Sequence, residues 1–435
     1  MQDKDDAPPL ALEAAEDADM IARCALSRST IDQVCFDPRL CFDEDDMTYR
    51  THEEDVVDQK HTGTCWLQAG LAFLSAIARK RGMRVRFSLV HVLFYDKLCK
   101  SETFLRSYAA EKNERVRWHL VHQGPVTDGG TWAMLMFLVR EFGVAPHGAH
   151  LPMQQASNTG RYNTHLNNYL KTAAVRVRNG ELSVEEALVP VTRSLQRVYG
   201  SPAATVELNE HAHGCAFAGS PRELASCVRQ AWPYEVLCHA PDRALGLYAG
   251  PCTNDPNSPS QDLFSCVEIS TIEQAAVRQL EAGVPVWFTC DVDADFCSAE
   301  GVAQHDLFRT AAVLGLPRAA QKRDRMLARA TAPVHAMLLT AVKVVDGRPK
   351  QWRIQNSWGT SSRGKGFVTA GHEWFVQNVF HVVVDRCFVG RDTLLQRHAP
   401  TKLTPWDLFS TAARACSRSG ADQQSRAQKG ARSTE

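Results

Sequence analysis

One cysteine lies where a loop is expected to turn into an apolar helix, and this junction limits the possible fold more than any other feature of the chain. Cys65 stands in the run QKHTGTCWLQAG, residues 59–70. Behind it, apolar residues recur at the spacing of one helical face, at Leu67, Leu71, Leu74 and Ala78. The sequence therefore predicts a helix that buries one face and directs its N-terminus, with Cys65, into a cleft.

Two residues far along the chain complete a pattern that is typical of a catalytic cysteine. His335 opens an apolar, strand-like run, and Asn356 lies in the run WRIQNSWG, residues 352–359. A partner imidazolium and the positive end of a helix lower the pKa of a thiol, so Cys65 would act as a thiolate. His335 would then pass a proton to a leaving amine, and Asn356 would accept a hydrogen bond from the other ring nitrogen.

Three further side chains are assigned supporting roles. Gln59 would donate its side-chain amide to a developing oxyanion, beside the backbone N–H of Cys65. Trp66 and Trp358 would shield the site from water. Each motif alone is compatible with a structural role, because a cysteine is commonly a small buried apolar residue. Their occurrence together and in this order favours catalysis.

The order cysteine, histidine, asparagine resembles that of papain-type thiol peptidases. The chain as a whole resembles the bleomycin hydrolase family, the cytosolic aminopeptidase branch of the papain superfamily. The resemblance covers roughly residues 58–407 and is weakest in the central third. Besides the active-site runs, it is carried by residues 87–98, 124–146, 284–292, 364–368, 373–375, 382–386 and 403–407.

This resemblance implies an α+β, papain-like cysteine peptidase with a helical half, a strand-rich barrel half and a large inserted lobe. It implies hydrolysis of N-terminal peptide and peptide-like amide bonds through a thioacyl-enzyme intermediate, with peptides as substrates. By match to the family pattern, the four active-site roles go to Gln59, Cys65, His335 and Asn356. The same cleft is also compatible with acyl transfer, and a scaffold that has lost catalysis is a further alternative.

The number of residues between Cys65 and His335 in the sequence predicts an insertion. His335 follows Cys65 by 270 residues, whereas simple papain-like enzymes use about 130–150. The surplus must form an added lobe. In the family, such an insertion builds the contacts of a hexameric ring whose active sites face an internal chamber, so the resemblance implies a homo-oligomer.

The chain is expected to divide into five parts. These are an acidic N-terminal arm (1–58), a helical half with the nucleophile (59–174), the inserted lobe (175–270), a strand-rich half with His335 and Asn356 (271–400), and a partly disordered C-terminal tail (401–435). The arm contains 17 acidic and 5 basic residues, a composition usually found in solvated segments. Besides the nucleophile helix, helices are predicted at 132–142 and 271–282, and strands at 284–289, 335–345, 351–356, 366–370 and 380–386.

The C-terminus departs from the family pattern. Relatives end within a few residues of a Trp-Asp motif, and their last carboxylate lies in the cleft, where it captures the free amino group of the substrate. Here Trp406-Asp407 is followed by a chain that continues to Glu435. The tail could be trimmed near Ala412–Ala413, could cover the site and inhibit it, or could swing away and leave an endopeptidase. We prefer trimming, because relatives end near this position.

Composition restricts the partners and the compartment. With 49 basic and 49 acidic residues, the chain lacks the excess of positive charge that a nucleic-acid-binding ring, the main alternative, usually has. No apolar run approaches the roughly 18 residues of a membrane span, and the acidic N-terminus does not resemble a signal peptide. Fourteen irregularly spaced cysteines favour reduced thiols and a cytoplasmic location. At Thr62, secreted relatives often have a second cysteine, so that disulfide is not expected.

No metal or cofactor is expected. The spacing of Asp291, Asp293 and Asp295 is that of the start of a calcium loop, but the required glycine and glutamate are replaced by Phe296 and Val302. A zinc site is also disfavoured, because no fourth ligand has a convincing spacing from the metal-capable group His211, His213 and Cys215.

Overall fold

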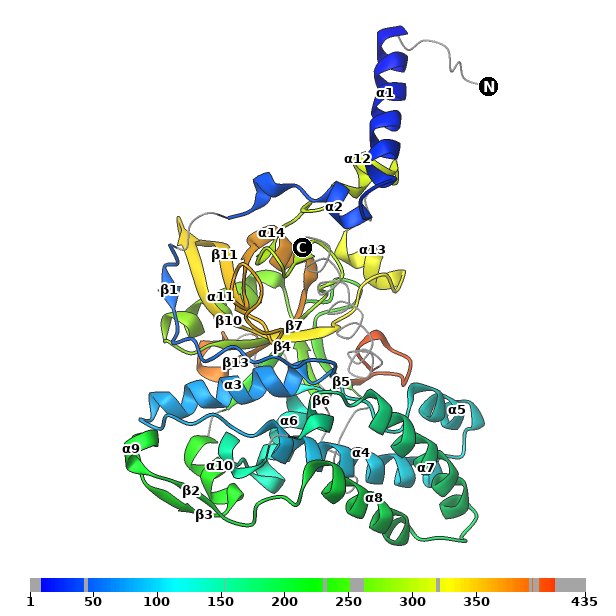
Figure 1. Ribbon diagram of the computed structural model, residues 1–435, viewed down its shortest axis with the longest axis vertical. Helices are drawn as coiled ribbons and strands as arrows, with labels where there is room; N and C mark the ends of the chain where they lie inside the picture. The colour runs from blue at the N-terminus through cyan, green and yellow to red at the C-terminus, as the bar shows by residue number, and fades with distance from the viewer. Residues whose placement is uncertain are drawn as a thin grey trace.

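The computed structural model describes residues 9–42, 46–151, 153–229, 233–250, 262–317, 321–390, 393 and 399–410. A layer of helices lies on one side of a large mixed sheet, and helix α3 (Cys65–Lys80) runs along the junction between the two (Figure 1). The site predicted from the sequence lies at this junction, because α3 packs directly against strand β10 (His335–Val345).

The helical layer begins where the sequence predicts it. Helix α3 starts at Cys65, and α6 has the predicted bounds. Hydroxyl caps fix the starts of two helices: Ser88 accepts a hydrogen bond from the backbone N–H of His91, and Thr131 accepts one from Met134. The layer consists of α3, α4 (Leu89–Ala110), α5 (Glu114–Gln123), α6 (Trp132–Phe142), α7 (Gly160–Arg178), α8 (Val184–Tyr199), α9 (Glu210–His213) and α10 (Pro221–Arg229), with the hairpin β2 (Val206–Leu208) and β3 (Phe217–Gly219).

The large sheet has the strand order β14-β5-β6-β4-β13-β7-β10-β11-β12-β9-β8, and β1 pairs with β10. All five predicted strands form, as β7 and β10 to β13, with ends that differ by at most three residues from the prediction. The strands are β1 (Tyr49–Arg50), β4 (Tyr234–Cys238), β5 (Gly246–Gly250), β6 (Asp262–Cys266), β7 (Val286–Cys290), β8 (Phe296–Cys297), β9 (Val302–Ala303), β10, β11 (Arg348–Gln355), β12 (Phe367–Gly371), β13 (Val379–Asp385) and β14 (Thr401–Lys402).

Helices and short turns also flank the sheet. The predicted helix at 271–282 is α11 (Ile269–Glu281). The remaining elements are α1 (Pro9–Leu26), α2 (Ile31–Cys35), α12 (Thr310–Leu314), α13 (Lys322–Leu327) and α14 (His372–Asn378), with the 3₁₀ turns η1 (Pro38–Leu40), η2 (His147–Ala149), η3 (Gln154–Ala156) and η4 (Arg386–Phe388).

Two apolar cores hold the layers together. The larger core joins the helices to one face of the sheet, with Trp66, Trp132 and Trp287 among its buried residues. The smaller core lies on the other face of the sheet, around Trp352 and Trp374. Since the indole N–H of Trp287 donates to the backbone oxygen of Trp66, at 3.3 Å, the sheet is also tied to α3 by a buried hydrogen bond.

The acidic N-terminal segment is more structured than its composition predicts. Helix α1 projects from the body of the molecule (Figure 1), but strand β1 joins the sheet, and Asp37 and Glu54 are buried. Both carboxylates are paired: Asp37 with Arg39 and Arg309, and Glu54 with Arg79. Acidic residues counted as solvated in the sequence therefore serve as partners for basic residues.

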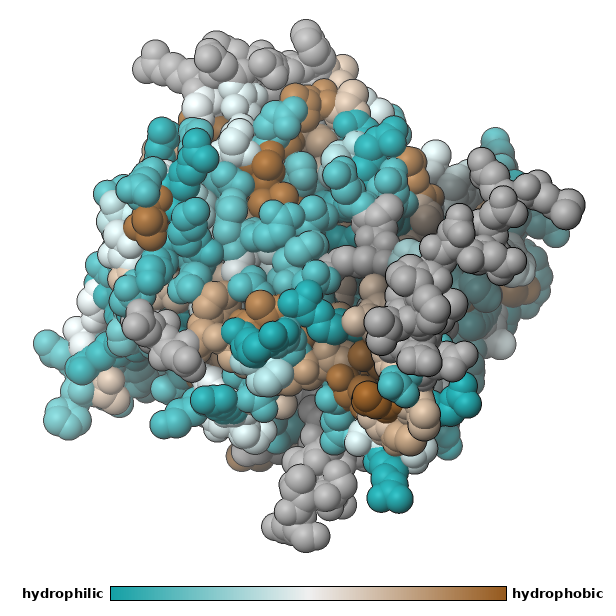
Figure 2. Space-filling model, turned by 90° about the horizontal axis from the view of Figure 1, so that it is seen from above, coloured by the Kyte–Doolittle hydropathy of each residue, from teal (hydrophilic) through white to brown (hydrophobic). Residues whose placement is uncertain are grey.

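The expected inserted lobe contributes to both layers. Its first part supplies α8, the β2–β3 hairpin and α10, whereas β4, β5 and β6 belong to the large sheet. Seen from the end of the molecule that carries α1, the surface is mostly hydrophilic, with smaller hydrophobic patches between (Figure 2). None of the helices in the described part of the chain combines the length and apolar character needed to cross a bilayer.

Candidate active site

The fold brings together the three residues predicted to carry the chemistry. Cys65 is the first residue of α3 and His335 is the first residue of β10; they are 1 % and 3 % exposed. The imidazole of His335 is hydrogen-bonded to the side chain of Cys65. Its Nε2 lies 2.8 Å from Oδ1 of Asn356, which directly follows β11.

The hydrogen bonds define the tautomer of His335. Oδ1 of Asn356 also accepts the backbone N–H of Ser357, at 2.8 Å, so the amide oxygen must be the atom that faces the imidazole. An oxygen of this kind only accepts, so Nε2 of His335 carries a proton and donates it to Asn356. The other ring nitrogen, Nδ1, then faces Cys65.

Electrostatics favour a charged pair between the two reactive groups. Burial by itself disfavours an imidazolium, but the charge and hydrogen bond of Cys65, the hydrogen bond of Asn356 and the charge of Asp293 together raise the pKa of His335 above its ordinary value. Cys65 also lies at the N-terminus of α3, where Thr64 makes no side-chain cap. The first-turn backbone N–H groups therefore receive no side-chain cap from Thr64, and the positive end of the helix favours negative charge at this position.

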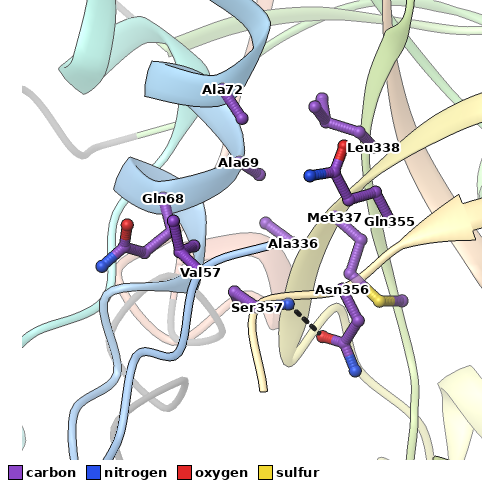
Figure 3. Close-up of a pocket in the computed structure, with 10 residues that line it drawn as sticks. All are labelled: Val57, Gln68, Ala69, Ala72, Ala336, Met337, Leu338, Gln355, Asn356 and Ser357. Carbon is purple, nitrogen blue, oxygen red and sulfur yellow. Dashed lines mark hydrogen bonds between the residues drawn. The ribbon is translucent and has the colours of Figure 1, made fainter. Parts of the chain in front are cut away.

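Small side chains let α3 approach β10 closely. Figure 3 shows Ala69 and Ala72 on α3 facing Ala336 and Leu338 on β10, with Gln355 beside them. The space left between these residues is a small cavity of about 10 Å³, with room for about one water molecule. This close packing is what holds the first residue of α3 within hydrogen-bonding range of the first residue of β10.

Gln59 lies beside Ser357, next to Asn356, and both polar atoms of its side-chain amide are hydrogen-bonded. Its Nε2 donates to the backbone oxygen of Thr62, and its Oε1 accepts the hydroxyl of Ser357, both at 2.6 Å. Its backbone N–H donates to the oxygen of Ser357, at 2.8 Å. The amide has a second hydrogen on Nε2, so it can donate one further hydrogen bond in the region in front of Cys65.

The two predicted shielding residues occupy different places. The ring of Trp358 lies 4.7 Å from the ring of His335 and is only partly exposed, so it lies over one side of the imidazole. Trp66 directly follows Cys65 and is buried, and its indole N–H donates to the backbone oxygen of Asp128, at 2.6 Å. A side chain on Gly130 would overlap the Trp66 ring, so this glycine is required for the close contact.

Asp128 is a residue of the site that the sequence did not single out. It is 3 % exposed, and its carboxylate accepts the backbone N–H of Gly63, two positions before the nucleophile, at 3.1 Å. Lys97 forms a buried ion pair with it at 2.5 Å, and the side chains of Thr159 and Asn163 donate to it. Burial opposes ionisation, but the charge of Lys97 and these hydrogen bonds hold the pKa of Asp128 well below its usual range.

The Asp128 network fixes the loop that presents Cys65. The only sign of this network in the sequence was the position of Asp128 in the run GPVTDGGTW, residues 124–132. The side chains that bind it come from α4 and from the start of α7. Lys100, a second buried lysine of α4, donates to the backbone oxygens of Thr127 and Gly129. The loop that carries Asp128 is thus held by two buried ammonium groups.

The last described residues pack against β13. Leu408, Phe409 and Ser410 are buried, and Phe409 packs edge-on against the ring of His381, with centroids 4.9 Å apart. Nδ1 of His381 is 3.0 Å from the hydroxyl of Thr289, which precedes the strand partner of His335. The predictions for the tail after Ser410, including trimming near 412–413, lie outside the described residues.

One arginine holds this C-terminal segment in place. The guanidinium of Arg243 lies 4.6 Å from the ring centroid of Phe409 and 3.5 Å from the carboxylate of Asp407. Arg243 is also paired with Asp242, at 3.1 Å. The last described residues therefore have a defined position against β6 and β13.

Comparisons with known proteins found chains that are similar to this one. A model of the family described as "Peptidase C1-like family" matches residues 10–207 and 243–410. Bleomycin hydrolase of Gallus gallus is 27 % identical over 399 residues, which cover 82 % of this chain and 86 % of the relative. Aminopeptidase C of Listeria innocua is 26 % identical over 399 residues, covering 84 % and 88 %. The crystal structure of PepW from Lactobacillus rhamnosis superposes with a TM-score of 0.78 at 22 % identity, over 93 % of this chain and 99 % of that one.

Proposed function

The chain belongs to the Peptidase C1-like family and is a cysteine peptidase with the predicted α+β, papain-like fold, and we propose that it is an aminopeptidase that uses Cys65, His335 and Asn356. The observation that carries these roles is the position of His335, which is hydrogen-bonded to Cys65 on one side and to Asn356 on the other. The names of the relatives, bleomycin hydrolase and aminopeptidase C, support removal of N-terminal residues from peptides.

The reaction follows from the contacts at the site. The thiolate of Cys65 attacks the carbonyl carbon of the scissile amide, and the carbonyl oxygen becomes an oxyanion that accepts hydrogen bonds from the backbone N–H of Cys65 and from Nε2 of Gln59. The C–N bond breaks as His335 gives its Nδ1 proton to the leaving amine. His335 then removes a proton from water, the hydroxide oxygen attacks the thioester, and the acid product leaves Cys65 as a thiolate. Asn356 keeps the imidazole in one orientation throughout.

Selectivity for a free amino group would come from the C-terminal segment. Arg243 and the buried Phe409 hold this segment against His381, which is hydrogen-bonded to Thr289, one residue before the strand partner of His335. We propose that the tail is trimmed near Ala412–Ala413, so that the new carboxylate lies in the cleft and binds the substrate ammonium group. A carboxylate at this place would also block the binding of longer segments on the N-terminal side of the bond.

Two outcomes compete with this proposal, namely an untrimmed tail that inhibits the enzyme and a displaced tail that leaves an endopeptidase. They are separated by assaying free and N-acetylated peptides with the full-length chain and with a chain truncated after Ala413. We expect the truncated chain to hydrolyse only the free peptides, and mass spectrometry of the purified full-length protein to find its C-terminus near 413. Equal rates on free and acetylated peptides in both chains would reject the aminopeptidase proposal.

Cys65→Ala tests the mechanism separately from selectivity. The proposal expects this variant to lose hydrolysis of every substrate while its fold and assembly remain unchanged, because the side chain is small and buried at the end of α3. Activity at the wild-type level would refute the assigned nucleophile. The same variant would also distinguish hydrolysis from a role as a nucleic-acid-binding ring, which does not require the thiol.

Assembly and location follow the family in this proposal. We propose a homo-hexamer whose sites face an internal chamber, with the insertion at 175–270 between the helical part (59–174) and the strand-rich part (271–400). We also propose a reducing, cytoplasmic environment. It is supported by Cys238 and Cys266, two buried strand partners that are not joined by a disulfide. Sedimentation would give the number of subunits.

A further inference from the structure

Two buried threonine hydroxyls hold the loop that leads to the nucleophile. Thr62 and Thr64 are 3 % and 0 % exposed, and they lie shortly before Cys65 in the chain. The hydroxyl of Thr62 donates to the backbone oxygen of Gln59, at 2.7 Å. In the opposite direction, Nε2 of Gln59 donates to the backbone oxygen of Thr62, at 2.6 Å. The amide that we assign to the oxyanion is thus tied to Thr62 by two hydrogen bonds.

A third hydrogen bond joins the two hydroxyls, and its direction follows from their other contacts. The hydroxyl oxygens of Thr62 and Thr64 are 2.7 Å apart. The hydrogen of the Thr62 hydroxyl is already given to the backbone oxygen of Gln59, which only accepts. The hydroxyl of Thr64 must therefore be the donor. A chain of hydrogen bonds runs from Thr64 through Thr62 to the backbone of Gln59.

Thr64 uses its hydroxyl for this chain instead of for the helix. It directly precedes α3, at the position where a threonine commonly accepts a hydrogen bond from a backbone N–H of the first helical turn. The side chain of Thr64 makes no such cap. Its hydroxyl is therefore committed to the loop that carries Gln59, at the expense of a contact that would stabilise the helix.

The turn between Gln59 and Thr62 needs this support. Lys60 has a φ of 53°, in the left-handed region that side chains other than glycine rarely adopt. Such a conformation costs free energy and persists only where the surrounding contacts impose it. The two hydrogen bonds between Gln59 and Thr62 span Lys60 and supply contacts of this kind.

We propose that Thr62, supported by Thr64, is a positioning residue for the oxyanion site, where its hydroxyl keeps Nε2 of Gln59 in place as a donor. This inference rests on the proposed function, because it concerns the oxyanion donor assigned there. Complete loss of such a donor typically lowers kcat about 100- to 1,000-fold. Loss of its support should cost less, about tenfold, because the amide remains present but is less well oriented.

The test measures kcat and KM for a free-amino dipeptide. Thr62→Val replaces the hydroxyl by a methyl group of similar size, Thr62→Ser retains a hydroxyl, and Thr64→Val removes only the end of the chain. Thr51→Val is the matched control, since the buried hydroxyl of Thr51 also donates to a backbone oxygen, that of Thr340, at 3.1 Å. Each change is also made in the Gln59→Ala protein.

Thr62→Val should lower kcat about tenfold with little change in KM. Thr62→Ser should restore most of the loss, and Thr64→Val should have a smaller effect than Thr62→Val. In the Gln59→Ala protein, Thr62→Val should cost nothing further, because the donor that it positions is already gone. Alkylation of Cys65 by iodoacetamide forms no oxyanion, so its rate should be the same in Thr62→Val as in the wild type.

Three results would overturn the inference: a kcat of Thr62→Val equal to that of the Thr51→Val control, a loss that persists undiminished in the Gln59→Ala protein, or an equal slowing of alkylation. If circular dichroism shows that Thr62→Val does not fold, Thr64→Val decides by the same comparisons. Equal turnover of free and acetylated peptides would reject the aminopeptidase proposal and leave this inference intact. A wild type that hydrolyses no peptide would overturn both.

Discussion

Removal of the Asp128 carboxylate should weaken both the fold and the catalytic loop. In Asp128→Ala, the ammonium of Lys97 loses an ion partner at 2.5 Å although its side chain is fully buried. Leaving such a charge buried without its partner typically costs about 3–5 kcal/mol in the free energy of unfolding. The variant also loses the hydrogen bond from the backbone N–H of Gly63, so the loop before Cys65 should be less ordered.

The measurement is urea unfolding followed by tryptophan fluorescence, with hydrolysis assayed on the same samples in the absence of urea. Glu185→Ala is the matched control, because its ion pair with Arg106, at 2.9 Å, is exposed and should contribute at most about 1 kcal/mol. We expect Asp128→Ala to lose several-fold more stability than the control. A loss of less than about 1 kcal/mol, equal to that of the control, would refute the reasoning that this buried pair organises the loop.

Four further predictions concern the chemistry and its selectivity. Gln59→Ala removes an oxyanion donor and should lower kcat by about 100- to 1,000-fold, measured at saturating peptide; a change below about tenfold would remove Gln59 from the oxyanion site. Asn356→Ala removes a hydrogen bond that raises the pKa of His335. Since the imidazolium is lost as pH rises through that pKa, the alkaline limb of the kcat/KM profile should move to lower pH; an unchanged limb would contradict this. Arg243→Ala releases Asp407 and Phe409, so the ratio of rates on free and acetylated peptides should fall, and an unchanged ratio would show that the clamp is not needed. The pKa of Asp128 is held low in the folded state. The difference in unfolding free energy between wild type and Asp128→Asn should therefore stay constant from neutral pH down to the ordinary Asp pKa of about 4, and shrink only below it. A difference that already shrinks near neutral pH would contradict the low pKa.

The main helices and strands, and the three residues for which we propose catalytic roles, were accessible from the sequence because each has a local signal. The apolar spacing after Cys65 predicts the start of α3 to the residue, and the apolar run after His335 predicts β10. The ordered Cys, His and Asn motifs then predicted a contact across 270 residues that the structure contains. Chemistry constrains these residue types together, so their joint occurrence was informative.

The parts that the sequence did not predict depend on partners from distant segments. Asp128 looks like an ordinary loop residue until Lys97, Thr159 and Asn163 surround it. Strand β4 pairs with β13, which lies far from it in the sequence. Such short strands also carry little periodicity of their own. The acidic arm was interpreted from its net charge, which does not show that Asp37 meets Arg309.

The central claim, that Cys65 and His335 form a charged pair, is tested most directly by the pH dependence of alkylation at Cys65. Iodoacetamide labelling between about pH 4 and 9, with peptide mapping to separate Cys65 from the other thiols, gives the fraction of thiolate at this one sulfur. The ordinary pKa of a thiol is about 8.5, and we predict that Cys65 is alkylated well below this pH. In His335→Ala, the pH at which Cys65 becomes reactive should rise toward that value. A wild-type Cys65 that reacts only near pH 8.5, or a profile that His335→Ala leaves unchanged, would contradict the account.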